Sequence, residues 1–218
     1  AKPMLKTSPG EGMIMPTAEF HFDFASPNAY MSHCVVPGIA ERTGVPITYV
    51  PVLLGGVFRL TNNRSPMEQN AGVLNKSEYG RIEMDRFVAR HKLDRFVMNK
   101  HFPMNTVALM RGALVAARDG QAAKYIDTVY SAMWEQGLKM DDPDVMVKAL
   151  TDAGMDGAAN LAGTQDQAIK DALLANTKAS VERGNFGSPT FFAGDEMFFG
   201  KDRLRDFEEE ILRQRDAG

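Results

Sequence analysis

Residues 22–30 constrain the fold most, because a predicted strand runs there directly into a predicted helix. Apolar residues alternate from Glu19 to Phe24, as is typical of a strand. Ser26 and Pro27 are the residue types preferred at a helix N-cap and at its first position. A helix N-terminus has free N–H groups and a partial positive charge, so it can hold an anion. Ser26 is therefore predicted either to cap the helix alone or also to contact an anionic ligand.

The next elements predict a βαβ unit with two parallel strands. The helix that Ser26 opens is expected to end near Arg42, before Thr43-Gly44-Val45-Pro46. Residues 47–53 are rich in β-branched side chains and predict a second strand, parallel to the first. Residues 57–75 are predicted to form a loop with one helical turn. Loops that leave the carboxyl end of a strand commonly bind ligands.

The rest of the chain predicts a helical block followed by a return to strands. Helices are expected at residues 78–92, 106–119, 122–136, 142–154 and 165–183. Residues 190–193 and 197–199 flank Gly194-Asp195-Glu196 and predict a hairpin. Pro189 precedes the first of these strands, and we predict a cis Ser188–Pro189 bond. A last helix is expected from Gly200 to about Arg213.

This order of elements is that of a thioredoxin-like α/β fold interrupted by a large all-helical insertion domain. The predicted division has three parts. Residues 1–17 form a flexible N-terminal tail. Residues 18–56 and 184–215 form the thioredoxin-like domain, and residues 57–183 form the helical insertion domain.

Composition excludes several classes of protein. The formal charge of −3 and the lack of a basic cluster argue against nucleic-acid binding. No apolar run approaches the roughly 18 residues that span a bilayer, and the first 16 residues lack the apolar core of a secretory signal. The single cysteine, Cys34, excludes an intrachain disulfide and a cysteine-rich zinc site. We expect no metal, a cytoplasmic location, and a buried structural role for Cys34.

Three stretches carry a resemblance to one family: Phe22-Asp23-Phe24-Ala25-Ser26-Pro27, Phe186-Gly187-Ser188-Pro189-Thr190-Phe191-Phe192 and Gly200-Lys201-Asp202-Arg203-Leu204. In this order and spacing they resemble the 2-hydroxychromene-2-carboxylate isomerases. The likeness covers about residues 18–213 and extends to the kappa-class glutathione transferases, which share the fold. Asn28 departs from the pattern, because an aromatic residue usually follows Ser-Pro in this family.

The resemblance implies that the chain binds glutathione, with Ser26 as the catalytic residue that donates a hydrogen bond to the thiolate. The positions that it assigns to glutathione are Ser26, Asn63, Lys76, Ser188, Pro189, Gly200, Lys201, Asp202 and Arg203. The backbone at Ser188 would pair with the cysteinyl part, and Asp202 would accept the γ-glutamyl ammonium group. Asn105 is the implied contact for the small-molecule substrate.

The implied reaction is a cis–trans isomerisation of a 2-hydroxychromene-2-carboxylate-like ring-cleavage product. In it the thiolate adds, the former double bond rotates and the thiolate is eliminated. Two alternatives remain open: a kappa-like transferase that conjugates glutathione to an electrophile, and a glutathione-binding protein without catalytic activity. The resemblance also implies a homodimer.

Overall fold

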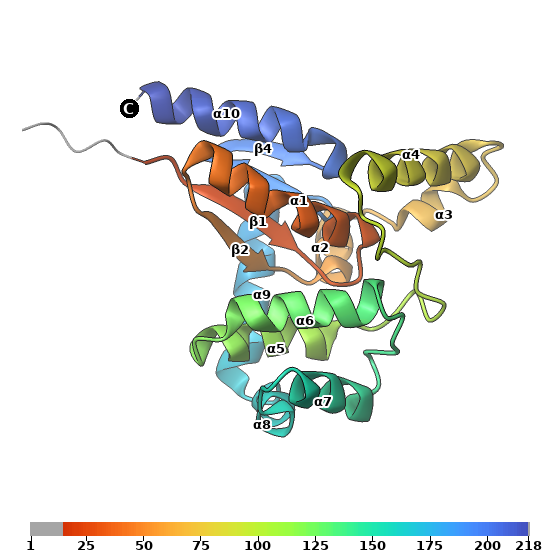
Figure 1. Cartoon of the computed structure of the whole chain (residues 1–218), viewed down its shortest axis with the longest axis vertical. Coiled ribbons are helices and arrows are strands. Elements are labelled where there is room, and N and C mark those ends of the chain that lie inside the picture. The colour runs from red at the N-terminus through yellow and green to blue at the C-terminus, as the bar shows by residue number, and fades with distance from the viewer. Residues whose placement is uncertain (1–14, 218) are drawn as a thin grey trace, which may run out of the picture.

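A mixed four-stranded sheet lies at the centre of the computed structural model, which describes residues 15–217 (Figure 1). Its strands are β1 (Ala18–Phe22), β2 (Ile47–Pro51), β3 (Thr190–Ala193) and β4 (Glu196–Phe199), in the order β2-β1-β3-β4. β1 pairs parallel with β2 and antiparallel with β3, and β3 and β4 form an antiparallel hairpin. The predicted parallel pair and the predicted hairpin are therefore confirmed.

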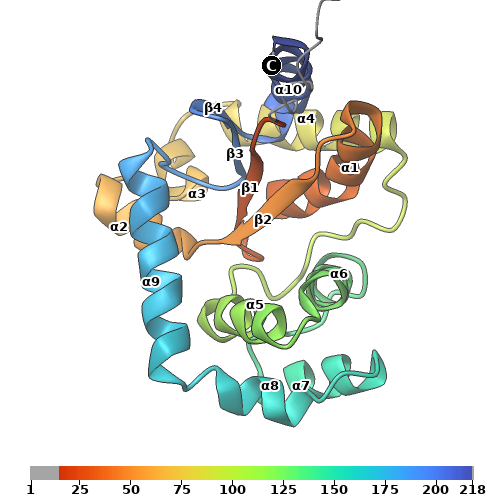
Figure 2. The ribbon, with the colours of Figure 1, turned by 90° about the vertical axis from the view of Figure 1, so that its left-hand side faces the viewer.

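The helices group into a cover for the sheet, a projecting arm and a separate helical layer (Figures 1 and 2). Their bounds are α1 Pro27–Thr43, α2 Leu54–Thr61, α3 Pro66–Asn70, α4 Lys76–His91, α5 Val107–Arg118, α6 Ala122–Trp134, α7 Pro143–Asp152, α8 Gly157–Gly163, α9 Gln167–Glu182 and α10 Leu204–Ala217. α1 and α10 pack together next to the sheet, while α5 to α8 lie beyond its other side. The fold is the expected thioredoxin-like α/β fold with a large helical insertion.

The alternating side chains of β1 serve both faces of the sheet, as the period of two in a strand requires. On one face Phe20 stacks on Phe191 with ring centroids 4.9 Å apart, and Phe191 lies 5.1 Å from Phe207 of α10. On the other face the buried His21 has its Nδ1 2.8 Å from Ser180 Oγ of α9. β1 thus connects an aromatic core on one side to a polar contact on the other.

Buried hydrogen bonds between closely packed helices hold the helical layer together. The buried Tyr125 hydroxyl of α6 donates to the Leu109 carbonyl of α5 at 2.9 Å. Asn160 Nδ2 of α8 donates to the Gly112 carbonyl of α5 at 3.1 Å. A Cβ atom at Gly112 would overlap the Tyr125 hydroxyl, so a side chain at this position would push the helices apart.

The expectation of a loop with one helical turn at residues 57–75 is wrong. α2 begins at Leu54, before the Gly55-Gly56 pair. Gly56 lets this helix approach Thr177 of α9, because a Cβ atom at position 56 would lie 3.1 Å from Thr177 Cγ2. α3 follows from a capping box, in which the Ser65 and Glu68 side chains each accept from the other residue's backbone. The sequence prediction also lacked α8, a seven-residue helix capped by Asp156.

Three further expectations have different outcomes. The helices predicted at 78–92, 106–119, 122–136, 142–154 and 165–183 are confirmed as α4, α5, α6, α7 and α9. Residues 1–14 of the expected tail lie outside the described residues, whereas the Thr17 carbonyl accepts from Gly194 N at 2.8 Å. The boundaries of the insertion domain stay a prediction. Within residues 15–217, no helix is long and apolar enough to cross a membrane.

We predict that His21 makes the fold sensitive to acid. Burial lowers the pKa of His21 from 6.5, against the hydrogen bond that Glu19 accepts from its ring, which raises it. The unfolded chain therefore takes up this proton first, and the free energy of unfolding falls as the pH drops below 6.5. In His21→Gln, the loss between about pH 6.5 and pH 5.5 should shrink by up to about 1 kcal/mol, as urea unfolding would measure.

His91→Gln is the matched control for this prediction. Burial also lowers the pKa of His91, but this residue at the end of α4 is only partly buried, so its variant should keep most of the wild-type loss. An acid-induced loss in His21→Gln equal to that of the wild type would contradict the assignment.

Candidate active site

Ser26 is the N-cap of α1, as its sequence position predicts. It is 6% exposed, and its Oγ accepts a hydrogen bond from Ala29 N at 3.1 Å. The same hydroxyl donates to the Ser188 carbonyl at 3.1 Å, because a carbonyl oxygen can only accept. Ser26 is therefore more than a cap: it joins the start of α1 to the segment that precedes β3.

The Ser188–Pro189 bond is cis, as predicted, and hydrogen bonds hold the residues on both sides of it. Ser188 Oγ accepts from Asp23 N at 3.2 Å. Gly200 N donates to the Pro189 carbonyl at 2.9 Å. These bonds bring together four positions that were predicted from three distant parts of the chain: Ser26, Ser188, Pro189 and Gly200.

A buried hydrogen-bond network around Asn185 holds the segment from Gly187 to Thr190. Asn185 Oδ1 accepts from Gly187 N at 2.8 Å and from Thr190 Oγ1 at 2.9 Å. Asn185 Nδ2 donates to Ser180 Oγ at 2.7 Å, and Ser180 also contacts His21. Asn185 thus anchors both sides of Ser188 to α9 and β1.

Asp23 is the residue whose importance the sequence did not reveal. Its carboxylate is 1% exposed and accepts three hydrogen bonds. Oδ1 accepts from Ala25 N at 2.9 Å and from Thr106 Oγ1 at 2.6 Å, and Oδ2 accepts from Leu54 N at 2.7 Å. Burial raises the pKa of Asp23, against these three bonds, which lower it. Asp23 therefore links the Ser26 turn to the starts of α2 and α5.

The helical layer also fixes the residue after Asp23. The buried Trp134 of α6 donates its Nε1–H to the Phe24 carbonyl at 2.9 Å. Met110 Sδ of α5 lies 3.4 Å from Phe24 N. The turn that carries Ser26 is consequently held by side chains from both α5 and α6.

The predicted residues Asn63 and Asn105 lie beside this cluster. Asn63 Nδ2 donates to the Phe186 carbonyl at 2.8 Å, two residues before Ser188. Asn105 is exposed and directly precedes Thr106, the partner of Asp23. Its Oδ1 accepts from Val107 N at 3.1 Å, at the start of α5. No described contact joins Asn105 to Ser26 itself.

Lys201, Asp202 and Arg203 form a short 3₁₀ turn before α10 rather than the first turn of that helix. Lys201 is 5% exposed, and its Nζ lies 2.7 Å from Asp202 Oδ1 and 4.9 Å from the ring centre of Phe87. Arg203 is exposed and pairs with Asp206 at 3.1 Å. The turn follows Gly200 directly and so lies next to the Pro189 carbonyl.

The structure does not bring Lys76 to the cluster. Lys76 is exposed at the start of α4, within the arm that projects from the body in Figure 1. It lies eleven residues before Phe87, the α4 residue that contacts Lys201, which is roughly 16 Å along a helix at 1.5 Å per residue.

Residues 17–212 match the family model of the DSBA-like thioredoxin domain. The chain belongs to the DsbA-like thioredoxin family. A 2-hydroxychromene-2-carboxylate isomerase of Pseudomonas putida is 28% identical over 188 residues, which is 85% of this chain and 89% of that protein. A solved structure of a 2-hydroxychromene-2-carboxylate isomerase has a TM-score of 0.79 at 27% identity, and covers 92% of this chain and 98% of its own.

A kappa-class relative is also found. Glutathione S-transferase kappa 1 of Caenorhabditis elegans is 22% identical over 202 residues, which is 87% of this chain and 88% of that protein. The predicted family resemblance is therefore confirmed, and relatives of this DsbA-like chain are named as isomerases and as a transferase.

Cys34 is exposed, so the expectation of a buried thiol is wrong. α1 turns Met31, Val36 and Ile39 into the core, while Cys34 lies on a neighbouring stripe together with Tyr30, which is itself buried. This stripe lines a groove of about 670 Å³ against α6 and residues 92–95. Partial burial raises the pKa of the Cys34 thiol. Since position 26 is serine, this DsbA-like chain has no Cys-x-x-Cys pair at its helix start.

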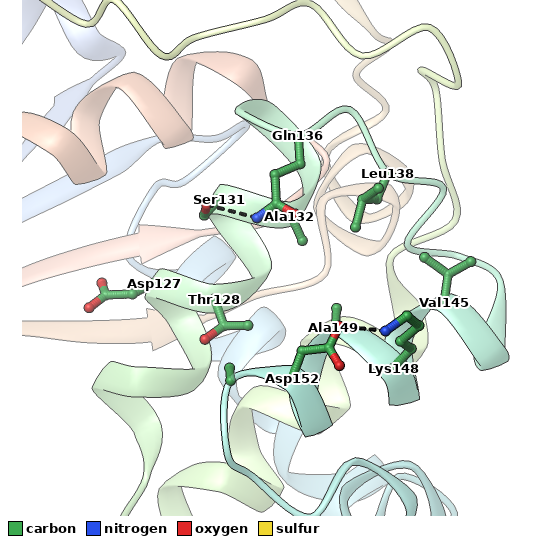
Figure 3. Close-up of a pocket in the computed structure, with 11 residues that line it drawn as sticks. Asp127, Thr128, Ser131, Ala132, Gln136, Leu138, Val145, Lys148, Ala149 and Asp152 are labelled. Carbon is green, nitrogen blue, oxygen red and sulfur yellow. Dashed lines mark hydrogen bonds and ion pairs between the residues drawn. The ribbon is translucent and has the colours of Figure 1, made fainter.

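A second groove, of about 630 Å³, lies between α6 and α7 and contains none of the predicted site residues (Figure 3). Ala132, Leu138 and Val145 contribute apolar surface to it. At its rim Lys148 pairs with Asp152 at 2.7 Å. The groove lies apart from the residues that the sequence predicts to bind glutathione or the substrate, so we do not assign the active site to it.

We predict that Asp23→Ala strongly destabilises the fold. It leaves the donors of Ala25, Leu54 and Thr106 without their acceptor, and each unsatisfied buried donor costs about 1–3 kcal/mol. The free energy of unfolding in urea should fall by at least about 3 kcal/mol. Thr106→Val is the matched control, because it removes one of the three donors and should cost about 1–2 kcal/mol. Equal losses in the two variants would show that Asp23 is not the shared anchor.

Proposed function

We propose that this protein is a glutathione-dependent cis–trans isomerase acting on a 2-hydroxychromene-2-carboxylate-like ring-cleavage product. One observation carries the proposal: a serine hydroxyl, with no cysteine at residues 26–29, stands at the N-terminus of α1 and faces the backbone of Ser188. A site of this kind can hold a thiolate but cannot supply one. The names of the isomerase relatives support the reaction type.

The residues fit the tripeptide in charge and in hydrogen-bonding groups. Ser188 offers its backbone to an extended peptide, in the manner of an added strand. Asp202 would accept the γ-glutamyl ammonium, and its side chain is 68% exposed despite the pair with Lys201. Arg203 could bind a carboxylate, and Asn63 supports the Ser188 segment through Phe186. Lys76, at the exposed start of α4, stays a proposed contact of the tripeptide.

Ser26 would lower the pKa of the bound thiol. A free thiol has a pKa of about 8.5, and a hydrogen bond to a charged group contributes roughly 1.5–3 kcal/mol, equal to about one to two pKa units. The dipole of α1 adds roughly 0.3–1 kcal/mol. Together these effects make the thiolate a major species near neutral pH.

Bound glutathione supplies a nucleophilic sulfur that adds to a conjugated double bond and is later eliminated, so that it is not consumed. Ser26 holds this sulfur as an anion before addition and after elimination. Asn105, at the exposed start of α5, is the proposed contact for the substrate. We also propose that the protein is cytoplasmic and forms a homodimer, as expected from the sequence.

A kappa-like transferase is the second candidate, favoured by the Caenorhabditis elegans relative. It would share the thiolate site but release the adduct. Conversion of a hydroxychromene carboxylate without loss of glutathione favours the isomerase, whereas rapid conjugation of 1-chloro-2,4-dinitrobenzene favours the transferase. Binding without turnover in either assay would leave a non-catalytic glutathione-binding protein.

We predict that Ser26→Ala raises the pKa of bound glutathione by about one to two units, because it removes a donor to the anion. Turnover near neutral pH should then fall at least about tenfold. The thiolate absorbance in the ultraviolet, titrated against pH, measures the pKa. Superimposable titrations of the two proteins would show that Ser26 is not the activating group.

Ser65→Ala is the matched control for this variant, since Ser65 is also an N-cap serine followed by proline. Loss of either cap should cost about 0.5–2 kcal/mol of stability. Only loss of Ser26 should change the thiol pKa.

Cys34→Ala should leave turnover within about tenfold of the wild type. Cys34 is the only cysteine of the chain, lies two turns from Ser26 and has a thiol pKa raised by partial burial. The measurement is glutathione-dependent turnover of a variant whose circular dichroism is unchanged. A larger loss would give this thiol a part in the reaction.

A further inference from the structure

The Ser26 hydroxyl has a single proton, and that proton is already in use. It is donated to the Ser188 carbonyl at 3.1 Å, while the oxygen accepts from Ala29 N. A hydroxyl has one O–H donor, so Ser26 cannot fully serve both the Ser188 carbonyl and a thiolate. To activate a thiol it must release the carbonyl.

The carbonyl cannot follow the hydroxyl, because its segment is fixed on both sides. Ser188 Oγ accepts from Asp23 N, and the flanking Gly187 N donates to the buried Asn185. On the other side the Pro189 carbonyl accepts from Gly200 N. Rotation of the Ser26 hydroxyl about its Cβ–Oγ bond is therefore the movement that frees the proton. This rotation leaves the Ser188 carbonyl without its donor.

We infer that the Ser188 carbonyl is a specificity determinant: Ser26 activates a thiol fully only when the ligand itself brings an N–H for that carbonyl. The ligand class is a peptide thiol, whose amide N–H lies on the same Cα as the thiol-bearing side chain. This inference rests on the proposed function, which takes Ser26 as the activating donor.

The reason lies in the number of hydrogen-bond donors and acceptors that each kind of thiol brings to the site. A peptide thiol adds one donor and one acceptor, so its N–H binds Ser188 and its sulfur receives the Ser26 proton. A thiol without the N–H adds only an acceptor. One of two acceptors, the part-buried carbonyl or the thiolate, then lacks a donor, and leaving an acceptor unsatisfied where a bound ligand covers it is unfavourable. Activation by Ser26 is consequently weakened for such thiols.

The test compares glutathione with its ketomethylene analogue, in which a CH₂ group replaces the cysteinyl N–H. The pKa of each bound thiol is titrated by ultraviolet absorbance in the wild type and in Ser26→Ala. We expect the wild type to lower the thiol pKa of the analogue by about one unit less than it lowers that of glutathione, each measured relative to the same thiol in solution. In Ser26→Ala the difference should vanish, because no hydroxyl remains to be released.

The outcomes separate this inference from the proposed function. An equal lowering of the two thiol pKa values by the wild type, relative to each ligand in solution and lost in Ser26→Ala, would overturn the inference and leave Ser26 as the activating donor. A bound glutathione pKa equal to that in solution, or no binding of glutathione, would overturn both. The analogue should lose less than about tenfold in affinity, since Ser26 keeps the carbonyl paired. A loss beyond about a hundredfold would also overturn the inference.

Discussion

The buried carboxylate of Asp23 is the constraint on which the site depends. Its three donors belong to the Ser26 turn, the start of α2 and the start of α5, so one side chain sets the mutual position of three segments. No cation pairs with it among residues 15–217, and burial raises its pKa. All three partners donate and the carboxylate can accept all of them, which explains how an acid is kept there at the cost of its desolvation.

The helical insertion is therefore part of the construction of the site. α5 supplies Thr106 to Asp23 and Met110 to Phe24, and α6 supplies Trp134 to the Phe24 carbonyl. In a free loop, the turn before a helix would fluctuate, and the Ser26 hydroxyl with it. Here both the hydroxyl and the Ser188 carbonyl are fixed by buried partners, so the geometry between them is set before any ligand arrives.

The predictable part of the site is the part that local chemistry determines. Ser26 at a strand–helix junction, and proline at position 189 before a strand, follow from residue preferences within a few positions. Asp23 could not be assigned this way, because it binds partners 31 and 83 residues away, at Leu54 and Thr106. α3 was missed although its capping box is local, since a five-residue helix has little periodicity to detect.

Serine at this corner gives a different chemistry from the cysteine of a Cys-x-x-Cys motif. A cysteine at a helix N-terminus has a lowered pKa and is itself the nucleophile. A serine hydroxyl stays protonated near neutral pH, so at the same position it remains a donor, and the sulfur has to come from a ligand. Because the Ser26 proton already has an acceptor in Ser188, the ligand must also replace that hydrogen bond. In the proposed reaction, the backbone of a peptide thiol therefore contributes to activation as well as to affinity.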